Sequence, residues 1–421
     1  MIPNRIFHLI ALLLLCLTSL HGQKLDNDAI LGFRMPEGKT SFTIPFELID
    51  NLVVVKVIMN RTLPLKFIID TGVRTSILTE KTFTDLLNIN YSRRIEIPVP
   101  GTQNFVDAFI APNITLNING LIGKGHAILV LEEDLLELKN ILGHNVQGIL
   151  GYELFSRFII EINYQNQVMT LYTLKGFEKK NIANNKRFKR IPITIEDTKP
   201  YCIADIVQKN GTYISAKLML DTGASHSILL IKESSTLIDL PEKRVYSHLG
   251  RGLGGDIKGY IGRVESLHLA DFHFNDIITT YPEPQFYDQD TVKVYRNGTL
   301  GGGIFSRFRI VFDFIHGYVY LKKNKKYKKP FEYNLSGVVI KAKGLYLNTF
   351  EIISVRENST AHSSGIEAGD MIVRINGQPT HNMQLDEVHS ILNSKPNRVL
   401  RLELDRDGEY LVRKFKLERV I

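Results

Sequence analysis

The chain of 421 residues repeats itself, and this duplication limits the folds that it can adopt. The segment around Asp70-Thr71-Gly72 matches the segment around Asp221-Thr222-Gly223, which lies 221 − 70 = 151 residues further on. A second match pairs Leu150-Gly151 with Leu300-Gly301, at an offset of 301 − 151 = 150. Two separate matches at nearly one offset indicate a duplicated domain instead of a chance motif.

Each copy has the same order of predicted strands. An apolar strand, Val53–Met59 or Cys202–Val207, reaches a turn, and a second strand then runs into Asp-Thr-Gly. The turn residues are Asn210-Gly211, a strong hairpin signal, and Asn60-Arg61, a weaker one. The strand pairs that close the two copies are Phe158–Ile162 with Val168–Tyr172 and Phe308–Phe312 with Tyr318–Leu321. Apart from a short helix near Glu80–Leu87 and the turn beginning at Tyr152, we expect a mainly β fold.

The doubled Asp-Thr-Gly favours catalysis by a pair of carboxyl groups. A single copy would indicate no more than a turn at a strand end, because Asp and Gly favour turns. Two carboxyl groups held within about 3 Å cannot both ionise, so they share one proton and can act together as base and acid. We therefore predict that Asp70 and Asp221 are the catalytic residues. The predicted supporting residues are Thr71, Gly72, Thr222 and Gly223, because Gly admits backbone amides and Thr can bond across the lobes.

These motifs resemble the retropepsin-like aspartic peptidases, the family of retroviral proteases and their cellular relatives. The second copy carries Asp221-Thr222-Gly223-Ala224-Ser225, with Leu300-Gly301 placed 301 − 221 = 80 residues later; the first copy has a spacing of 151 − 70 = 81. The resemblance covers residues 40–322 and implies two β lobes related by a pseudo-twofold axis, with Leu-Gly behind each catalytic turn. The departures from the family's pattern are Val73, Arg74, Thr299 and the run Gly301-Gly302-Gly303.

The resemblance also implies a β-hairpin flap from each lobe over the bound peptide. In the second lobe the candidate is Gly252, Leu253 and Gly254, beginning 252 − 221 = 31 residues after Asp221. In the first lobe Gly101 and Thr102 begin 101 − 70 = 31 residues after Asp70. At both places an ordinary hairpin turn is the alternative.

The chain after Leu335 changes character and resembles a PDZ domain of the type found on bacterial exported proteases. Its most distinctive part runs from Ala368-Gly369-Asp370 to Ile375-Asn376-Gly377, and a predicted amphipathic helix over residues 385–392 follows. PDZ domains capture a chain terminus by strand addition, with loop amides holding the carboxylate. The resemblance points to Gly344, Leu345, Tyr346 and Leu347 as peptide-binding residues. The alternative is that the protein's own chain fills the groove.

The N-terminus resembles a secretory signal peptide. Arg5 supplies the positive start, Ile10–Leu17 is apolar, and a polar exit precedes Gln23. We therefore expect residues 1–22 to be removed and the mature chain to be periplasmic or secreted. An uncleaved membrane anchor and a lipid on Cys16 are the alternatives. Without Cys16, only Cys202 remains, so the mature chain can form no internal disulfide.

The formal net charge of +8 comes largely from two short basic stretches, residues 179–190 and 322–329. Both fall between predicted folded units, so solvated linkers are favoured over an anion-binding site. Neither contains aromatic residues interleaved with base-reading side chains, and we expect no nucleic-acid partner.

The sequence thus predicts an exported aspartic endopeptidase that acts on a peptide or protein substrate without a metal or cofactor. The predicted parts are residues 23–175 and 176–325, the two lobes, and residues 332–421, a small α+β PDZ-like domain that takes a C-terminal peptide in its groove. Since the lobes lie in one chain, we expect a monomer, although pairing between chains is an alternative. A non-catalytic peptide-binding protein that retains the fold is the alternative from another class.

Overall fold

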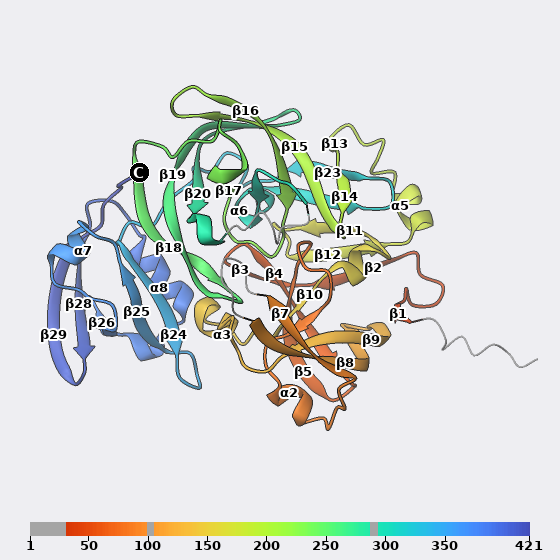
Figure 1. Cartoon of the computed structure of the whole chain (residues 1–421), viewed down its shortest axis with the longest axis horizontal. Coiled ribbons are helices and arrows are strands. Elements are labelled where there is room, and N and C mark those ends of the chain that lie inside the picture. The colour runs from red at the N-terminus through yellow and green to blue at the C-terminus, as the bar shows by residue number, and fades with distance from the viewer. Residues whose placement is uncertain (1–30, 99–104, 287–293) are drawn as a thin grey trace, which may run out of the picture.

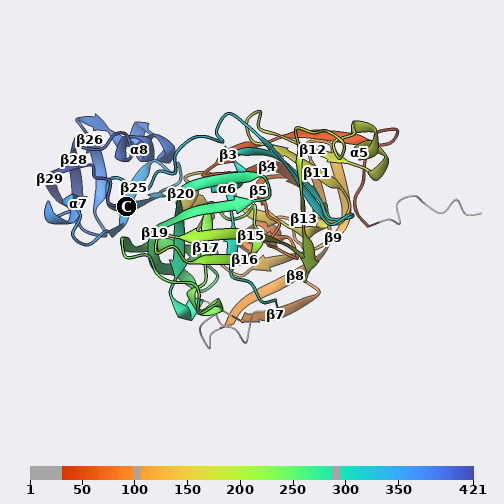
Figure 2. The same cartoon turned by 90° about the horizontal axis from the view of Figure 1, so that it is seen from above.

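The computed structural model describes residues 31–98, 105–286 and 294–421. It is mainly β, as predicted, with two β-rich lobes beside each other and a smaller unit of strands and helices at one end (Figure 1). The view from above shows the same arrangement, with the smaller unit, in blue, beyond the lobes (Figure 2). The predicted signal peptide lies outside the described residues. No helix within the described ranges is long and apolar enough to cross a membrane.

The sheet of the first lobe is built around the hairpin of β4 and β5. Asn60 and Arg61 both adopt left-handed backbone, with φ of 46° and 65°, which gives a turn that matches the twist of the flanking strands. The strands are β1 Gly32–Phe33, β3 Glu47–Ile49, β4 Leu52–Met59, β5 Leu63–Ile69, β6 Ile77–Leu78, β7 Arg93–Pro98, β8 Phe105–Ile118, β9 Leu121–Leu131 and β10 Gly148–Leu150. Its helices are α2 Thr82–Asp85, α3 Leu138–Leu142 and α4 Tyr152–Phe155.

The sheet of the second lobe repeats this plan. Gly211, with φ of 85°, makes the turn between β15 and β16 at the predicted place. The strands are β14 Thr194–Glu196, β15 Lys199–Gln208, β16 Tyr213–Leu220, β17 Ile228–Leu230, β18 Arg244–Gly252, β19 Gly255–Leu269, β20 Phe272–Pro282 and β21 Gly298–Leu300. The helical turns are η3 Lys232–Ser234, η4 Pro284–Phe286 and α6 Gly302–Phe305.

A third sheet joins the lobes. Its strands run in the order β13 Lys189–Pro192, β23 Tyr318–Lys323, β22 Phe308–Asp313, β11 Ile159–Asn163, β12 Val168–Tyr172 and β2 Ser41–Pro45, and α5 Leu174–Lys180 follows β12. At its centre β11 of one copy pairs antiparallel with β22 of the other, placing Ile160 opposite Phe312. Phe155 and Phe305, which are duplicate positions, both pack edge-on against Phe312. The two lobes therefore share one hydrophobic core.

The PDZ-like unit has a core of its own. Its strands are β24 Val338–Lys343, β25 Thr349–Val355, β26 Met371–Ile375, β27 Gln378–Pro379, β28 Val399–Arg406 and β29 Glu409–Lys416, and its helices are α7 Thr360–Ser363, η5 Thr380–Asn382 and α8 Leu385–Leu392. Asp370 of the distinctive motif is fully buried and accepts hydrogen bonds from the Arg406 guanidinium at 2.6 and 2.9 Å. This pair explains why the motif needs an acidic residue.

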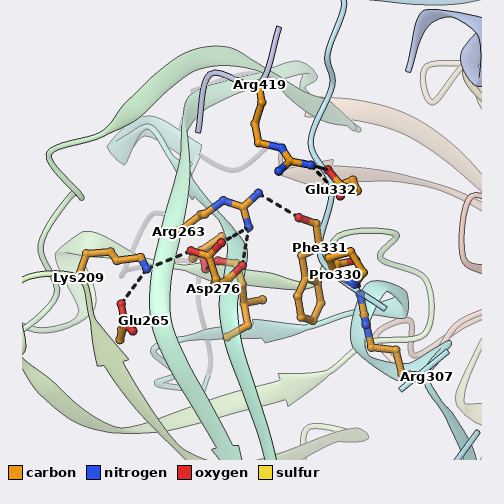
Figure 3. A network of polar contacts seen from close by, with 11 residues as sticks. Lys209, Arg263, Glu265, Asp276, Arg307, Pro330, Phe331, Glu332 and Arg419 are labelled. Atoms are coloured by element: carbon orange, nitrogen blue, oxygen red, sulfur yellow. Dashed lines mark hydrogen bonds and ion pairs between the residues drawn. The ribbon is translucent and has the colours of Figure 1, made fainter. Parts of the chain in front are cut away.

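The second basic stretch begins in β23, which ends at Lys323, and the residues that follow lead towards the PDZ-like unit with their backbone held by the second lobe. The Arg307 guanidinium donates to the carbonyl oxygens of Lys326, Lys329 and Pro330. Its Cζ lies 3.6 Å from the centroid of the Phe331 ring, and Figure 3 shows Arg307, Pro330 and Phe331 at this place. Arg263 Nη2 donates to Phe331 O at 3.0 Å. The lysine side chains stay largely exposed while these contacts fix the path of the chain into the PDZ-like unit.

Candidate active site

Two duplicate strands deliver the Asp-Thr-Gly turns to the junction of the lobes. Strand β5 ends at Ile69 directly before Asp70, and β16 ends at Leu220 directly before Asp221. In each lobe a parallel neighbour, β10 or β21, lies beside the end of that strand. The amide of Asp70 donates to Leu150 O at 2.8 Å, and the amide of Asp221 donates to Leu300 O at 2.9 Å. The two leucines thereby fix where each turn begins.

The two threonines bond reciprocally across the pseudo-twofold axis. Thr71 Oγ1 donates to Leu220 O at 2.6 Å and accepts from the amide of Thr222 at 3.0 Å. In the opposite direction, Thr222 Oγ1 donates to Ile69 O at 2.8 Å and accepts from the amide of Thr71 at 3.1 Å. Thr71 and Thr222 are 1% and 0% exposed, so no water competes for these bonds.

The carboxyl groups of Asp70 and Asp221 lie together: a Cβ added at Gly72 would lie 3.1 Å from Asp70 Oδ1 and 3.1 Å from Asp221 Oδ2. Each accepts from its own glycine: Gly72 N donates to Asp70 Oδ1 at 2.6 Å, and Gly223 N donates to Asp221 Oδ1 at 2.9 Å. A Cβ added at Gly223 would lie 2.2 Å from Asp70 Oδ2, so a larger residue would displace the Asp70 carboxyl group. Glycine is therefore required for the close approach of the two turns.

The environment favours a proton on this pair. Burial raises the pKa of Asp70 well above its usual range, and the charge of Asp221 raises it further. The hydrogen bond from the amide of Gly72 and the charge of Lys199 lower the pKa of Asp70. Burial and the neighbouring carboxylate both disfavour a negative charge on Asp70, so a proton is favoured on this carboxyl group.

Leu-Gly packs behind each turn, in the expected arrangement. A Cβ at Gly151 would lie 2.2 Å from Val73 O, and one at Gly301 would lie 2.4 Å from His226 O. Val73 O also accepts from the amide of Tyr152 at 2.9 Å. Only glycine lets the backbone pass at this distance, which accounts for its presence in both copies.

Each lobe also supports the Asp-Thr-Gly turn of the other lobe through its first hairpin. Asn51, in the β3–β4 turn, donates through Nδ2 to Ser225 O at 3.3 Å. Asp197, in the equivalent β14–β15 turn, lies 3.4 Å from Arg74 Nη1. Arg74, a departure from the family's pattern, thus contacts the opposite lobe.

Two ionisable residues, Lys199 and His226, interact electrostatically with the aspartates, and no sequence motif points to either of them. Lys199 follows the Asp197 turn, and burial lowers its pKa while both aspartates raise it. His226 lies in the second catalytic loop, where burial lowers its pKa to about 4. Lys199 interacts with the carboxyl pair only through the tertiary fold, for which a single sequence carries no pattern. His226 follows Asp221 in the same loop, but the motif alone gives no reason to single it out.

The candidate flap of the second lobe is the hairpin of β18 and β19, with Leu253 and Gly254 in its turn. Leu253 packs against an apolar cluster of the first lobe, which contains Val106, Leu131 and Leu136. Arg251 Nε donates to Leu135 O at 2.7 Å. The hairpin therefore reaches across to the first lobe. Gly101 and Thr102, the candidates in the first lobe, lie outside the described residues.

The PDZ residues singled out from the sequence lie in the tight turn between β24 and β25. Leu345 and Tyr346 are 85% and 78% exposed, whereas Leu347 is buried. Their role in peptide binding stays a prediction. At the other end of β24, the amides of Ser336 and Gly337 both donate to Asn334 Oδ1 at 2.9 Å, so the chain's own side chain occupies them.

The comparisons with known proteins agree with the domain types. A family model described as an aspartyl protease matches residues 206–301, and one described as a PDZ domain matches residues 324–405. Two similar solved structures are basic 7S globulin from soybean (10% identity, TM-score 0.39, covering 68% of this chain and 95% of that chain) and conglutin gamma, a basic 7S globulin from lupine seeds (12%, 0.40, 69% and 97%). No curated protein sequence matches.

Fold and family models together define a two-lobed protein with an aspartyl-protease domain of the retropepsin-like type. The matched segment contains Asp221-Thr222-Gly223 and Leu300-Gly301, the motifs that the first lobe repeats. The other matched segment, residues 324–405, is a PDZ domain.

The first prediction concerns the bonds between the threonines. Thr71→Val removes the donor to Leu220 O and leaves the buried amide of Thr222 without its acceptor, so we expect a loss of about 2–3 kcal/mol in the free energy of unfolding. Urea denaturation measures it. Thr43→Val is the matched control, because the Thr43 hydroxyl pairs with Thr170 at an exposed site. Its loss should lower the free energy of unfolding by less than about 1 kcal/mol. Equal losses in the two variants would contradict this account.

Proposed function

We propose that this protein is an exported aspartic endopeptidase whose carboxyl pair activates water for peptide hydrolysis. The observation that carries the proposal is the close approach of the Asp70 and Asp221 carboxyl groups at the junction of two duplicate lobes. Export follows from the N-terminal sequence, which has the charge and apolar pattern of a signal peptide.

The chemistry uses the single shared proton. The ionised carboxylate of the pair takes a proton from a water molecule, and the resulting oxygen attacks the peptide carbonyl carbon. The protonated carboxyl group donates its hydrogen bond to the carbonyl oxygen, where negative charge develops. When the C–N bond breaks, a proton passes from the pair to the leaving nitrogen, and the pair again holds one proton.

The amides of Gly72 and Gly223 keep the two carboxyl groups in a fixed orientation during this cycle. The hairpin around Leu253 would cover the substrate and exclude water other than the reacting molecule. The PDZ domain supplies a second place for a peptide, from the substrate or from a partner, by strand addition to the edge strand β24.

The second prediction tests catalysis. Asp70→Asn and Asp221→Asn each remove one member of the pair, so each should reduce peptide cleavage by a factor of about 10³ or more without unfolding the protein. Cleavage of a peptide library by the purified mature chain, read by mass spectrometry, measures this loss. Asp271→Asn is the control, since Asp271 forms a surface ion pair with Lys189 at 2.7 Å. Near-normal turnover in either of the first two variants would disprove the shared pair.

The third prediction concerns the pH dependence. The pair must keep one proton, so activity ends on the alkaline side as pH rises through its upper pKa. Since burial and Asp221 raise the pKa of Asp70, and Val73 and Ala224 lack a hydroxyl that would stabilise the charge, activity should peak in mildly acidic to near-neutral buffer. The charge of Lys199 lowers the pKa of Asp70, so Lys199→Gln should move the alkaline limb to higher pH.

The pH–rate profiles of the wild type and the Lys199→Gln variant check this shift. Lys217→Gln is the control, because its ammonium group pairs with Glu196 at 2.7 Å. An alkaline limb that stays in place or moves to lower pH in the Lys199 variant would refute the assignment. A wild-type peak in strongly acidic buffer would refute the expected optimum.

A further inference from the structure

One carboxylate, that of Glu137, joins the two lobes and the PDZ domain. Its Oε1 lies 3.2 Å from Nη2 of Arg251, in the hairpin of the second lobe. Its Oε2 lies 2.9 Å from Nζ of Lys341, in strand β24 of the PDZ domain. Glu137 directly precedes α3 and has left-handed backbone, with φ of 46°. The side chain is 25% exposed, so both ion pairs are partly protected from solvent.

The hairpin depends on this junction near its tip. Arg251 is the second residue before the turn, and besides Glu137 it contacts Leu135 O at 2.7 Å and Asp256 Oδ1 at 2.7 Å. Leu253, in the turn itself, packs on the first lobe. The segment 135–137 therefore provides the polar anchor beside the apolar contact of the tip.

The PDZ domain holds the same segment from the other side. Asn140 Nδ2 donates to Ala342 O at 2.8 Å, and α3 lies beside β24 (Figure 1). A Cβ at Gly143 would lie 2.4 Å from Leu385 Cβ, at the start of α8. His144 Nε2 lies 3.5 Å from Asp386 Oδ2, on the same helix. Residues 137–144 thus extend from β24, an edge strand of its sheet, to the beginning of α8.

The base of the hairpin also contacts the end of the PDZ domain. Ile421 packs with Val245 of β18 and Ile261 of β19. Next to it, Arg419 pairs with Glu332 of the linker at 3.0 Å, and Arg263 of β19 holds Phe331 O (Figure 3). The PDZ domain is therefore fixed against the hairpin at both of its ends.

We propose that the PDZ domain holds the β18–β19 hairpin in its position across the lobes, with residues 137–144 of the first lobe acting as an internal ligand of the PDZ domain. Glu137 links the position of the hairpin to the contact between residues 137–144 and the PDZ domain, because it orients Arg251 only while Lys341 and α3 are in place. An extended peptide that adds to β24 would meet Asn140 at the same edge. This inference concerns the position of the hairpin, and it goes beyond the proposed function.

The fourth prediction measures the hairpin directly by amide hydrogen exchange of the whole chain without substrate. Lys341→Gln should speed exchange of the amides in residues 250–257 by about threefold to tenfold, the effect of one partly buried ion pair. Lys343→Gln is the matched control: it removes a charge from the same strand, but its partner is Glu351 at 3.3 Å. Exchange in residues 250–257 of the control should match the wild type.

A mutant cycle tests the role of Glu137. In the Glu137→Gln background, Lys341→Gln should add nothing further to the exchange rate, because the shared carboxylate is already absent. Wild-type exchange in Lys341→Gln, or additive effects in the double variant, would overturn the proposal. Exchange needs no hydrolysis, so this outcome is independent of whether the protein proves to be a peptidase.

Discussion

The reciprocal hydrogen bonds between Thr71 and Thr222 are the interaction on which the rest of the site depends. They join two turns that are 151 residues apart in the chain, and they exclude water from the seam. With the turns fixed at this distance, the carboxyl groups of Asp70 and Asp221 must meet, and burial makes two negative charges there too costly. The sheet shared by the lobes also holds them together, since β11 of the first lobe pairs with β22 of the second lobe across the axis.

Duplication made most of this predictable from one sequence. A motif such as Leu150-Gly151 is uninformative alone, but its copy at Leu300-Gly301 shows that both belong to one plan, and the structure places each behind its turn. Lys199 and Glu137 could not be found in this way, because neither belongs to a repeated motif and each acquires its partners by packing. The chain that leads to the PDZ domain could also be predicted only in part. Its lysines indicated that it is exposed, but no motif indicated that Arg307, which lies before it in the chain, would fix its backbone.

The PDZ domain is more closely integrated than its separate core suggests. Asp370 and Arg406 form an ion pair within the domain. Its edge strand and the start of α8, however, contact residues 137–144, and its last residue packs on the hairpin of the second lobe. Residues 137–144 therefore contact the edge strand and the helix start of a module known for binding extended peptides, next to the proposed flap.

The central claim is that the two aspartates form one proton-sharing pair. Its most direct test is a titration of the protein with ¹³C-labelled aspartate carboxyl groups, followed by NMR. The account predicts that the Asp70 and Asp221 signals change together in the same two steps, with one proton kept to a pH above the ordinary range of Asp, about 3.9. Independent single-step curves for the two residues would contradict it.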